Sequence, residues 1–324
     1  MRAAPRLAAT LFGLTSILGG ATMGRAQDDF GTTGAVVLRM PVGARPVALG
    51  DAYTAVEGDE LSVFYNPGGL ASAAALSLGA SYQSYISDAR LITLSGTIPV
   101  GPGTLGLGVN SLDFGSIDEV REDPTFAGQT GKATGRQVGA SEFVAVAGYG
   151  VRARPGVGGG VAARVVRSDI AGTSGTAVAA DLGVRVAPWG VRGPSLGASL
   201  LNLGTDVKLA GRSDPLPRTF RVGAALAVGD AAGLLGGLAT LDLVAVRGGA
   251  TRLGAGIEAG RGFGDVRLMG RLGLRTTTAD ESLADAVTFG GGLEIGPFRL
   301  DYAYLGFDLF GATHRFGLRW QQPL

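Results

Sequence analysis

The chain has 324 residues, with 57 glycines, one histidine, no cysteine and a formal net charge of +1 at pH 7. Without cysteine there is no disulfide and no thiol chemistry, and a net charge near zero gives no electrostatic reason to expect nucleic-acid binding. A single histidine excludes a multi-histidine metal site.

The first 26 residues have the pattern of a secretory signal peptide. Arg2 and Arg6 precede an apolar run over residues 7–20, and Gly24 and Ala26 supply the small residues of a cleavage site. No later apolar run is long enough for a transmembrane helix, although hydrophobic residues make up 46% of the chain. An exported chain of this kind is predicted to be a soluble β-protein or a membrane β-barrel.

The stretch after the signal peptide predicts short helices. Ala48, Ala52 and Val56 recur every four residues and predict the apolar face of one helix. Asp59 is placed to cap a second helix, which the Asn66–Gly69 turn ends. Helices this short are marginal in water, so we expect them to dock on another part of the protein.

The sequence of residues 43–71, GARPVALGDAYTAVEGDELSVFYNPGGLA, resembles the N-terminal signature of PorV/PorQ-type outer-membrane proteins. It resembles the FadL-type barrels more distantly. Gly68 stands where these families usually have alanine. The resemblance implies an integral barrel of the bacterial outer membrane, and it indicates the barrel class better than the function. The residues that carry this resemblance are called the plug motif here, because we expect the segment to fill the barrel as a plug. They are Gly43, Ala44, Arg45, Gly50, Asp59, Tyr65, Asn66, Pro67, Gly69 and Leu70.

From residue 76 the sequence alternates with a period of two. In Val266–Arg275, apolar residues share one parity and arginines the other, so they face opposite sides of a strand. Such segments recur about fourteen times, as expected for tilted membrane strands. The predicted strands are 76–85, 90–99, 103–112, 139–150, 157–168, 175–187, 194–203, 217–228, 238–247, 252–261, 265–275, 286–296, 297–306 and 310–321.

We therefore predict an all-β fold, a transmembrane antiparallel β-barrel of about 14 strands with a short helical plug in its lumen. The signal peptide spans 1–26, the plug segment 27–75 and the barrel 76–324. Connections after odd-numbered strands are predicted to be mostly long, as at 113–138 and 204–216, and those after even-numbered strands mostly short. Bacterial barrels sort external loops and periplasmic turns in this way.

The inward parity carries charges of both signs. Buried charges need partners, and the plug residues Glu57, Asp59 and Glu60 are candidates, although a solvated lumen explains the charges equally well. Inward glycines such as Gly106 and Gly254 indicate close approach of another backbone, or only curvature and base composition. The candidate lumen charges are Asp181, Arg185, Glu258, Arg267, Arg271 and Glu294.

No catalytic, cofactor or metal site is predicted. His314 lies on the apolar parity of the last strand, which is typical of an interfacial residue. The acidic residues within 113–138 fit no known calcium loop. We predict that the protein is not an enzyme and needs no cofactor.

Two functions of different classes remain. The resemblance to PorV-like proteins implies an interaction platform in type IX secretion, with secreted cargo and secretion-machinery proteins as partners. The sequence has no long apolar outer loop that could form a capture groove for a solute, which favours this function. The alternative is a FadL-like transporter of hydrophobic solutes. A structural barrel with neither role stays open. In each case the surrounding partner is outer-membrane lipid, and no nucleic acid is expected.

Overall fold

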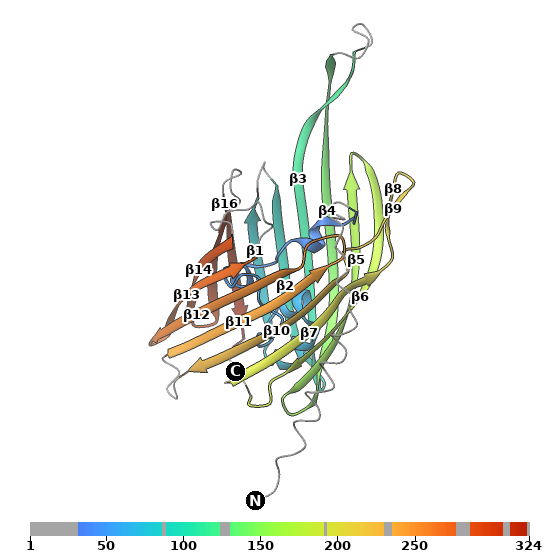
Figure 1. Ribbon diagram of the computed structural model, residues 1–324. Helices are drawn as coiled ribbons and strands as arrows, with labels where there is room; N and C mark the ends of the chain where they lie inside the picture. Colours follow the sequence, from blue (N-terminus) through green and yellow to red (C-terminus); the bar gives the residue numbers. More distant parts are fainter. Residues whose placement is uncertain are drawn as a thin grey trace, which may run out of the picture.

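The computed structural model describes residues 32–85, 89–123, 130–190, 193–229, 235–276, 286–306 and 312–322. The signal peptide prediction lies outside these residues. Fourteen strands form a closed antiparallel barrel, in which the first strand pairs with the last (Figure 1). The predicted fold class is confirmed.

The predicted strands each overlap a strand of the barrel, and outside β3 and β4 the boundaries differ by no more than three residues. The barrel strands are β1 (Ser77–Ser84), β2 (Arg90–Val100), β3 (Gly103–Glu122), β4 (Gly131–Arg154), β5 (Val157–Ile170), β6 (Thr173–Val186), β7 (Gly193–Gly204), β10 (Thr219–Gly229), β11 (Leu235–Val246), β12 (Arg252–Phe263), β13 (Val266–Arg275), β14 (Val287–Ile295), β15 (Phe298–Gly306) and β16 (Ala312–Gln321). The shorter elements are η1 (Val36–Arg39), α2 (Ala44–Ala48), α3 (Ser62–Tyr65), η2 (Pro67–Ser72), β8 (Val207–Leu209) and β9 (Arg212–Asp214).

The outer surface of the barrel is apolar, as the alternation predicts. On β13, Leu268, Leu272 and Leu274 are exposed, whereas Arg271 between them is buried inside. We call the end where β1 begins and β16 finishes the turn end, and the opposite end the loop end. Aromatic side chains are exposed near both ends, as in membrane barrels. They include Trp189, Phe263 and Phe298 near the turn end, and Tyr82, Phe220 and Phe289 near the loop end.

The connection between β3 and β4 corrects the prediction of a loop over 113–138. The two strands stay paired out to Glu122 and Gly131, and the hairpin projects beyond the other strands (Figure 1). Register shifts interrupt the ladder between Asp113 and Ser116 and again between Asp118 and Val120. Beyond the wall both faces of a hairpin meet water, so the apolar alternation that reveals a strand is absent. The connection is long, as predicted, but its described residues are mainly paired strand and not loop.

The first predicted helix is also misplaced. Helix α2 ends at Ala48, where the prediction begins, because Gly50 and Asp51 adopt positive φ angles of 66° and 64° and break the helix. Ala52 and Val56 are buried by contacts with the rest of the plug and with the wall, so their four-residue spacing does not reflect a helix. The second helix, α3, ends at Tyr65 as predicted, and η2 follows it directly.

The described part of the plug segment packs against the inward faces of the wall. Helix α2 contacts β13–β16, and η2 contacts β3–β7. Wall glycines permit this contact. A Cβ at Gly197 would overlap the carbonyl oxygen of Thr54, and one at Gly106 would lie 2.7 Å from Leu70 Cδ2. Close approach by the plug therefore accounts for glycine at these inward positions.

Gly197→Val tests this packing. The added side chain must displace the plug or the wall, at a cost of at least about 1–3 kcal/mol, as for other overpacked sites. We expect trypsin to cleave the plug after Arg39 or Arg45 in this variant while the barrel keeps its heat-modifiable mobility on gels. Gly270→Val is the matched control, because Gly270 is exposed and has no atom near its Cβ position. Equal protease resistance in both variants would contradict the tight docking.

Candidate functional site

Arg45 anchors the plug to one side of the wall. From helix α2 it donates Nε and Nη2 to the two carboxylate oxygens of Glu258 on β12, at 3.0 and 2.9 Å. It also donates to the hydroxyl of Tyr53 at 3.0 Å and lies 3.6 Å from the carboxylate of Asp59. Burial opposes the charged form of Arg45, but Glu258, Tyr53 and Asp59 together outweigh it and raise the pKa of Arg45. The fork-to-fork contact thus holds a permanent charge pair at the plug surface.

Wall residues extend this cluster. Arg271 on β13 pairs with Glu258 and, through Nη1, with Asp301 at 2.8 Å. Arg299 reaches the same Asp301 carboxylate at 3.0 Å. Charges of opposite sign therefore alternate across β12, β13 and β15, and each buried group has a partner, as a low-dielectric interior requires.

A second cluster holds the turn that follows α2. Asp242 on β11 accepts the backbone N–H groups of Tyr53 and Thr54, at 3.1 and 3.0 Å. Arg221 on β10 lies 3.3 Å from this carboxylate and 3.3 Å from that of Asp51 in the plug. The wall therefore supplies hydrogen-bond partners that the broken helix cannot supply itself.

The third cluster lies where the β6–β7 ladder has a register shift. Asp181 points inward, pairs with Arg164 on β5 and accepts the backbone N–H of Asn202 at 2.7 Å. Arg164 also donates to the carbonyl groups of Val63 and Phe64 in α3, at 3.2 and 3.3 Å. A residue on the wall thus satisfies carbonyl groups that a one-turn helix leaves open.

Asn66 connects three parts of the structure. Its Nδ2 donates to the carbonyl groups of Thr54 and Val184, at 2.7 and 3.0 Å. Its Oδ1 accepts the N–H of Gly68 at 2.9 Å and so caps η2, in which Pro67 is the first residue. The Asn-Pro pair therefore ends one helix, starts the next and fastens both to β6.

The other motif residues shape or pack the plug. Gly43 and Gly50 have φ angles of 82° and 66°, which suit glycine. Ala44 and Leu70 are buried, and Gly69 lies against Ser62 of α3. The Tyr65 hydroxyl accepts from the N–H of Val42 at 3.0 Å and donates to its carbonyl at 2.8 Å.

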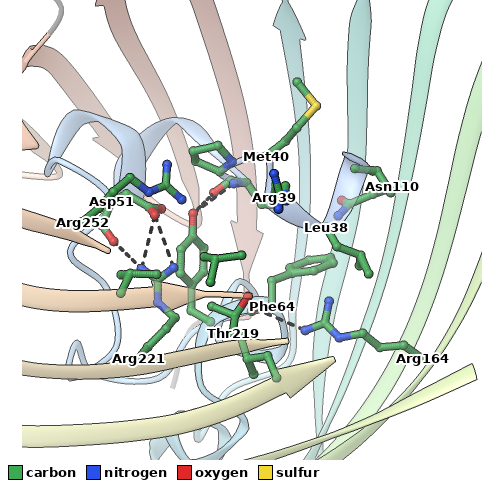
Figure 2. A pocket seen from close by; sticks show the side chains of 17 residues that line it. Leu38, Arg39, Met40, Asp51, Phe64, Asn110, Arg164, Thr219, Arg221 and Arg252 are labelled. Carbon is green, nitrogen blue, oxygen red and sulfur yellow. Dashed lines mark hydrogen bonds and ion pairs between the residues drawn. The ribbon is translucent and has the colours of Figure 1, made fainter. Parts of the chain in front are cut away.

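A cavity of about 50 Å³ lies on the loop-end side of the plug (Figure 2). Its floor is formed by Phe64 and Tyr65, and Leu38 and Met40 of the preceding segment lie along it. The ion-paired Arg221 and other polar wall residues complete the lining. The polar lining residues include Arg39, Asp51, Asn110, Arg164, Thr219 and Arg252.

Above this cavity the inward face of the wall carries an apolar cluster, with the hydrogen-bonded Glu142 and Ser168 beside it. The β8–β9 hairpin covers it, with Val207 fully buried, and Val37 of η1 packs into the same cluster. The inward wall residues of this loop-end cluster are Leu91, Leu112, Val144, Val166, Ala177 and Ala179. The lumen therefore has an apolar cluster toward the loop end, whereas ion pairs predominate around the plug.

The remaining predicted lumen charges have separate places. Arg185 donates Nε to the carbonyl of Ala55 at 2.9 Å, and Glu294 lies 3.8 Å from Arg319. Arg267 lines a cavity near the turn end. Arg185, Arg271 and Asp181 are buried, whereas Glu258, Arg267 and Glu294 are half-buried.

The predicted partnership of these charges with the plug acids needs correction. Within the described ranges, Glu57 and Glu60 form no ion pair, and Asp59 pairs with Arg45 of the plug itself. The plug acid that reaches the wall is Asp51, beside Arg221. Two features of the fold decide this. The break after α2 turns Asp51 toward the wall, and Arg45 of the plug is already the ion-pair partner of Asp59.

Sequence reasoning missed Asp51, Arg164, Arg221, Asp242 and Asp301. Each wall residue of this group stands on the inward parity of a predicted strand, as Asp181 does, so alternation alone could have found it. The pairing could not have been found, because it depends on which strands the plug contacts.

Glu60 is a buried acid with an open acceptor. Its side chain lies beside a cavity of about 20 Å³, and its Oε2 has no hydrogen-bond partner. Burial, together with the neighbouring Asp59, raises the pKa of Glu60 to about 7.

The described residues hold no cluster of three or more metal-ligating side chains. His314 is exposed on the outer wall, and its Nδ1 lies 2.9 Å from the hydroxyl of Tyr302. No helix of the described chain is long and apolar enough to cross a membrane.

No protein-family model and no curated protein matches the sequence. Solved structures match at the level of fold. The Pseudomonas putida toluene transporter TodX aligns with a TM-score of 0.56 at 12% identity, over 87% of this chain and 98% of that one. The Ralstonia pickettii toluene transporter TbuX gives 0.56 at 11% identity, over 87% and 98%. A Pseudomonas aeruginosa FadL homologue gives 0.53 at 10% identity, over 86% and 98%.

This likeness shows a FadL-like barrel fold. The finer resemblance to PorV/PorQ-type proteins stays a prediction, as does the expectation that the protein is not an enzyme.

Glu60→Gln should stabilise the protein in a pH-dependent way. Below about pH 4, folded and unfolded chains both hold the proton, so the raised pKa costs nothing. As the pH rises from the ordinary pKa of 4.5 to about 7, only the unfolded chain releases it, and the folded state loses about 3 kcal/mol of stability. The variant should therefore melt higher than wild type at pH 8 and at the same temperature at pH 4.

The measurement is the apparent Tm of the heat-modifiable barrel at both pH values. Glu122→Gln is the control, because Glu122 is exposed on the projecting hairpin. A Glu60→Gln gain that is equal at pH 4 and pH 8 would contradict the buried, protonated carboxyl group.

Proposed function

We propose that this protein is an integral outer-membrane channel for small hydrophobic solutes, closed in this structure by its plug. Its fold is similar to that of TodX and TbuX, which are toluene transporters, over nearly the whole length of those chains. The apolar outer surface and the aromatic residues near both of its ends support a place in the membrane.

The loop-end apolar cluster is the observation that carries the proposal. In a water-filled barrel the lumen-facing residues are polar. Here the inward positions of β2–β5 at the loop end include the buried Leu91, Leu112, Val144 and Val166. The buried Glu142 lies beside them, with its two carboxylate oxygens hydrogen-bonded to Ser168 and to the N–H of Val37. Such a surface repels ions and stabilises an apolar solute. It adjoins the cavity floored by Phe64, so a solute that enters from the loop end would meet this apolar cluster before it reaches the polar cavity above the plug.

The structure represents a closed state of such a channel. The 50 Å³ cavity is far smaller than the roughly 150 Å³ of a dry cavity that holds benzene. The β8–β9 hairpin covers the cluster, and Gly34 of the plug segment lies directly against Val207 and Asp214. Entry therefore requires that this hairpin separate from the plug segment.

A disulfide across this contact tests the proposal. The chain has no cysteine, and a Cβ at Gly34 would lie 3.6 Å from that of Val207, within the range of disulfides. In cells that lack another hydrophobic-solute channel, the wild type should speed toluene uptake. Oxidised Gly34→Cys/Val207→Cys should slow it at least about fivefold, and reduction should restore it.

Ser116→Cys/Gly139→Cys is the matched control, because its Cβ atoms would be 3.7 Å apart at exposed positions of the projecting hairpin. Wild-type uptake no faster than that of cells without the protein would overturn the proposed function. Unchanged uptake by the oxidised lumen pair would overturn only the hairpin as the gate.

The projecting β3–β4 hairpin favours a second candidate, the secretion platform that binds cargo or secretion-machinery proteins. Ile117 and Val120 are exposed near its end, with 72% and 60% of their surfaces accessible. Exposed apolar residues on a protruding hairpin are typical of a surface that binds a partner.

Joining Asp113 to Ala140 by an Asn-Gly turn would remove this hairpin. If the platform hypothesis holds, the shortened protein should lose the secretion proteins that the full chain captures from detergent-solubilised outer membrane. Toluene uptake should not change. Capture that is equal with and without the hairpin would remove the support for this candidate.

A further inference from the structure

Two cavities flank Arg185 near the turn end of the lumen. One, of about 240 Å³, lies between η2 and the β4–β5 and β6–β7 turns. The other, of about 280 Å³, lies between the plug and β10–β13. Arg185 on β6 lines both. Neither cavity belongs to the apolar route at the loop end, because the plug lies between them and it.

The charge of Arg185 lacks an ion-pair partner among the described residues. The residue is 8% exposed, and only its Nε is hydrogen-bonded, to the carbonyl of Ala55 at 2.9 Å. The two terminal nitrogens, with four N–H donors, have no partner within the described chain. Glu57 of the plug acts on Arg185 through space but makes no ion pair with it. A buried guanidinium without a carboxylate is costly unless an anion binds to it.

The 240 Å³ cavity has the lining that such an anion needs. Among the described residues that line it, the charged ones are Arg185 and the exposed Arg152, and none is acidic. Ala71, Val157 and Ala187 supply apolar surface. The volume exceeds the roughly 150 Å³ of a cavity that holds benzene. A planar guanidinium binds a carboxylate through two parallel hydrogen bonds, which suits a carboxylate at Arg185 with its apolar part in this cavity.

We propose that the turn end contains a binding site for a small organic carboxylate with a compact apolar body, held by Arg185 and Arg152. The site goes beyond the proposed transport of neutral solutes and does not depend on it. The carboxylate of Glu57 on the plug repels the bound anion, whereas the guanidinium groups of Arg185 and Arg152 attract it. The affinity for the anion depends on the difference between these effects.

Isothermal titration of the purified full-length protein in a neutral detergent tests this site. Benzoate, benzamide and acetate are the probes, since benzamide keeps the ring without the charge and acetate keeps the charge without the ring. We expect benzoate to bind at least about tenfold more tightly than either. Arg185→Gln should weaken benzoate about tenfold, and Glu57→Gln should tighten it a few-fold.

Arg154→Gln is the control for general charge, because Arg154 is exposed on the same turn and does not line the cavity. Equal binding of benzoate and benzamide would overturn the proposal, as would equal loss in the Arg185 and Arg154 variants. If the Arg185→Gln variant is unstable, the tighter benzoate binding expected of Glu57→Gln still tests the proposed site. The assay involves no transport, so its failure leaves the toluene experiment unaffected.

Discussion

The docking of an irregular polypeptide segment inside a closed barrel is the constraint on which the other features depend. The plug has helices of only four to six residues, so most of its backbone groups find no partner within a helix. Water cannot reach them once the segment is buried, and the wall has to satisfy them. Asp242 accepts two N–H groups, and Arg164, Ser195 and Ser199 donate to plug carbonyl groups. The inward polar residues are thus complementary to the plug backbone.

Glycine in the wall is the second part of the same solution. Gly160, Gly183 and Gly197 stand where the plug backbone comes so close that any Cβ would overlap it. Wall side chains at positions next to these glycines extend to the plug and donate hydrogen bonds to it. Small and long residues therefore alternate around the plug. Dense contact and hydrogen bonds therefore fill the part of the lumen in which the charged residues lie.

The lumen has two chemically distinct halves because the plug fills only part of it. Around the plug, paired charges such as Arg45 and Glu258 fix its position. Toward the loop end, Leu112 and Val144 face inward and are covered by the β8–β9 hairpin and η1. In the proposed channel, a solute held by the apolar loop-end cluster would have to pass the charged part, so its release toward the turn end would depend on movement of the plug or on a path beside it. The two larger cavities lie at that end.

The sequence by itself determined the barrel. A membrane strand must be apolar on one face, and the apolar residues of the sequence therefore recur with a period of two. It also located Tyr65 and Asn66 at the end of a helix, since proline restricts the residue before it. The tertiary structure alone decided the partners. Glu258 pairs with Arg45 and Arg221 with Asp51 because the closed barrel brings β12 and β10 to different residues of the plug. No spacing along the chain encodes these contacts. It also decided the end of α2 and the length of the β3–β4 hairpin. At the end of α2, contacts with the wall outweigh the helical spacing of Ala48, Ala52 and Val56. Along the projecting β3–β4 hairpin both faces meet water, so the sequence lacks the apolar alternation that predicts a strand.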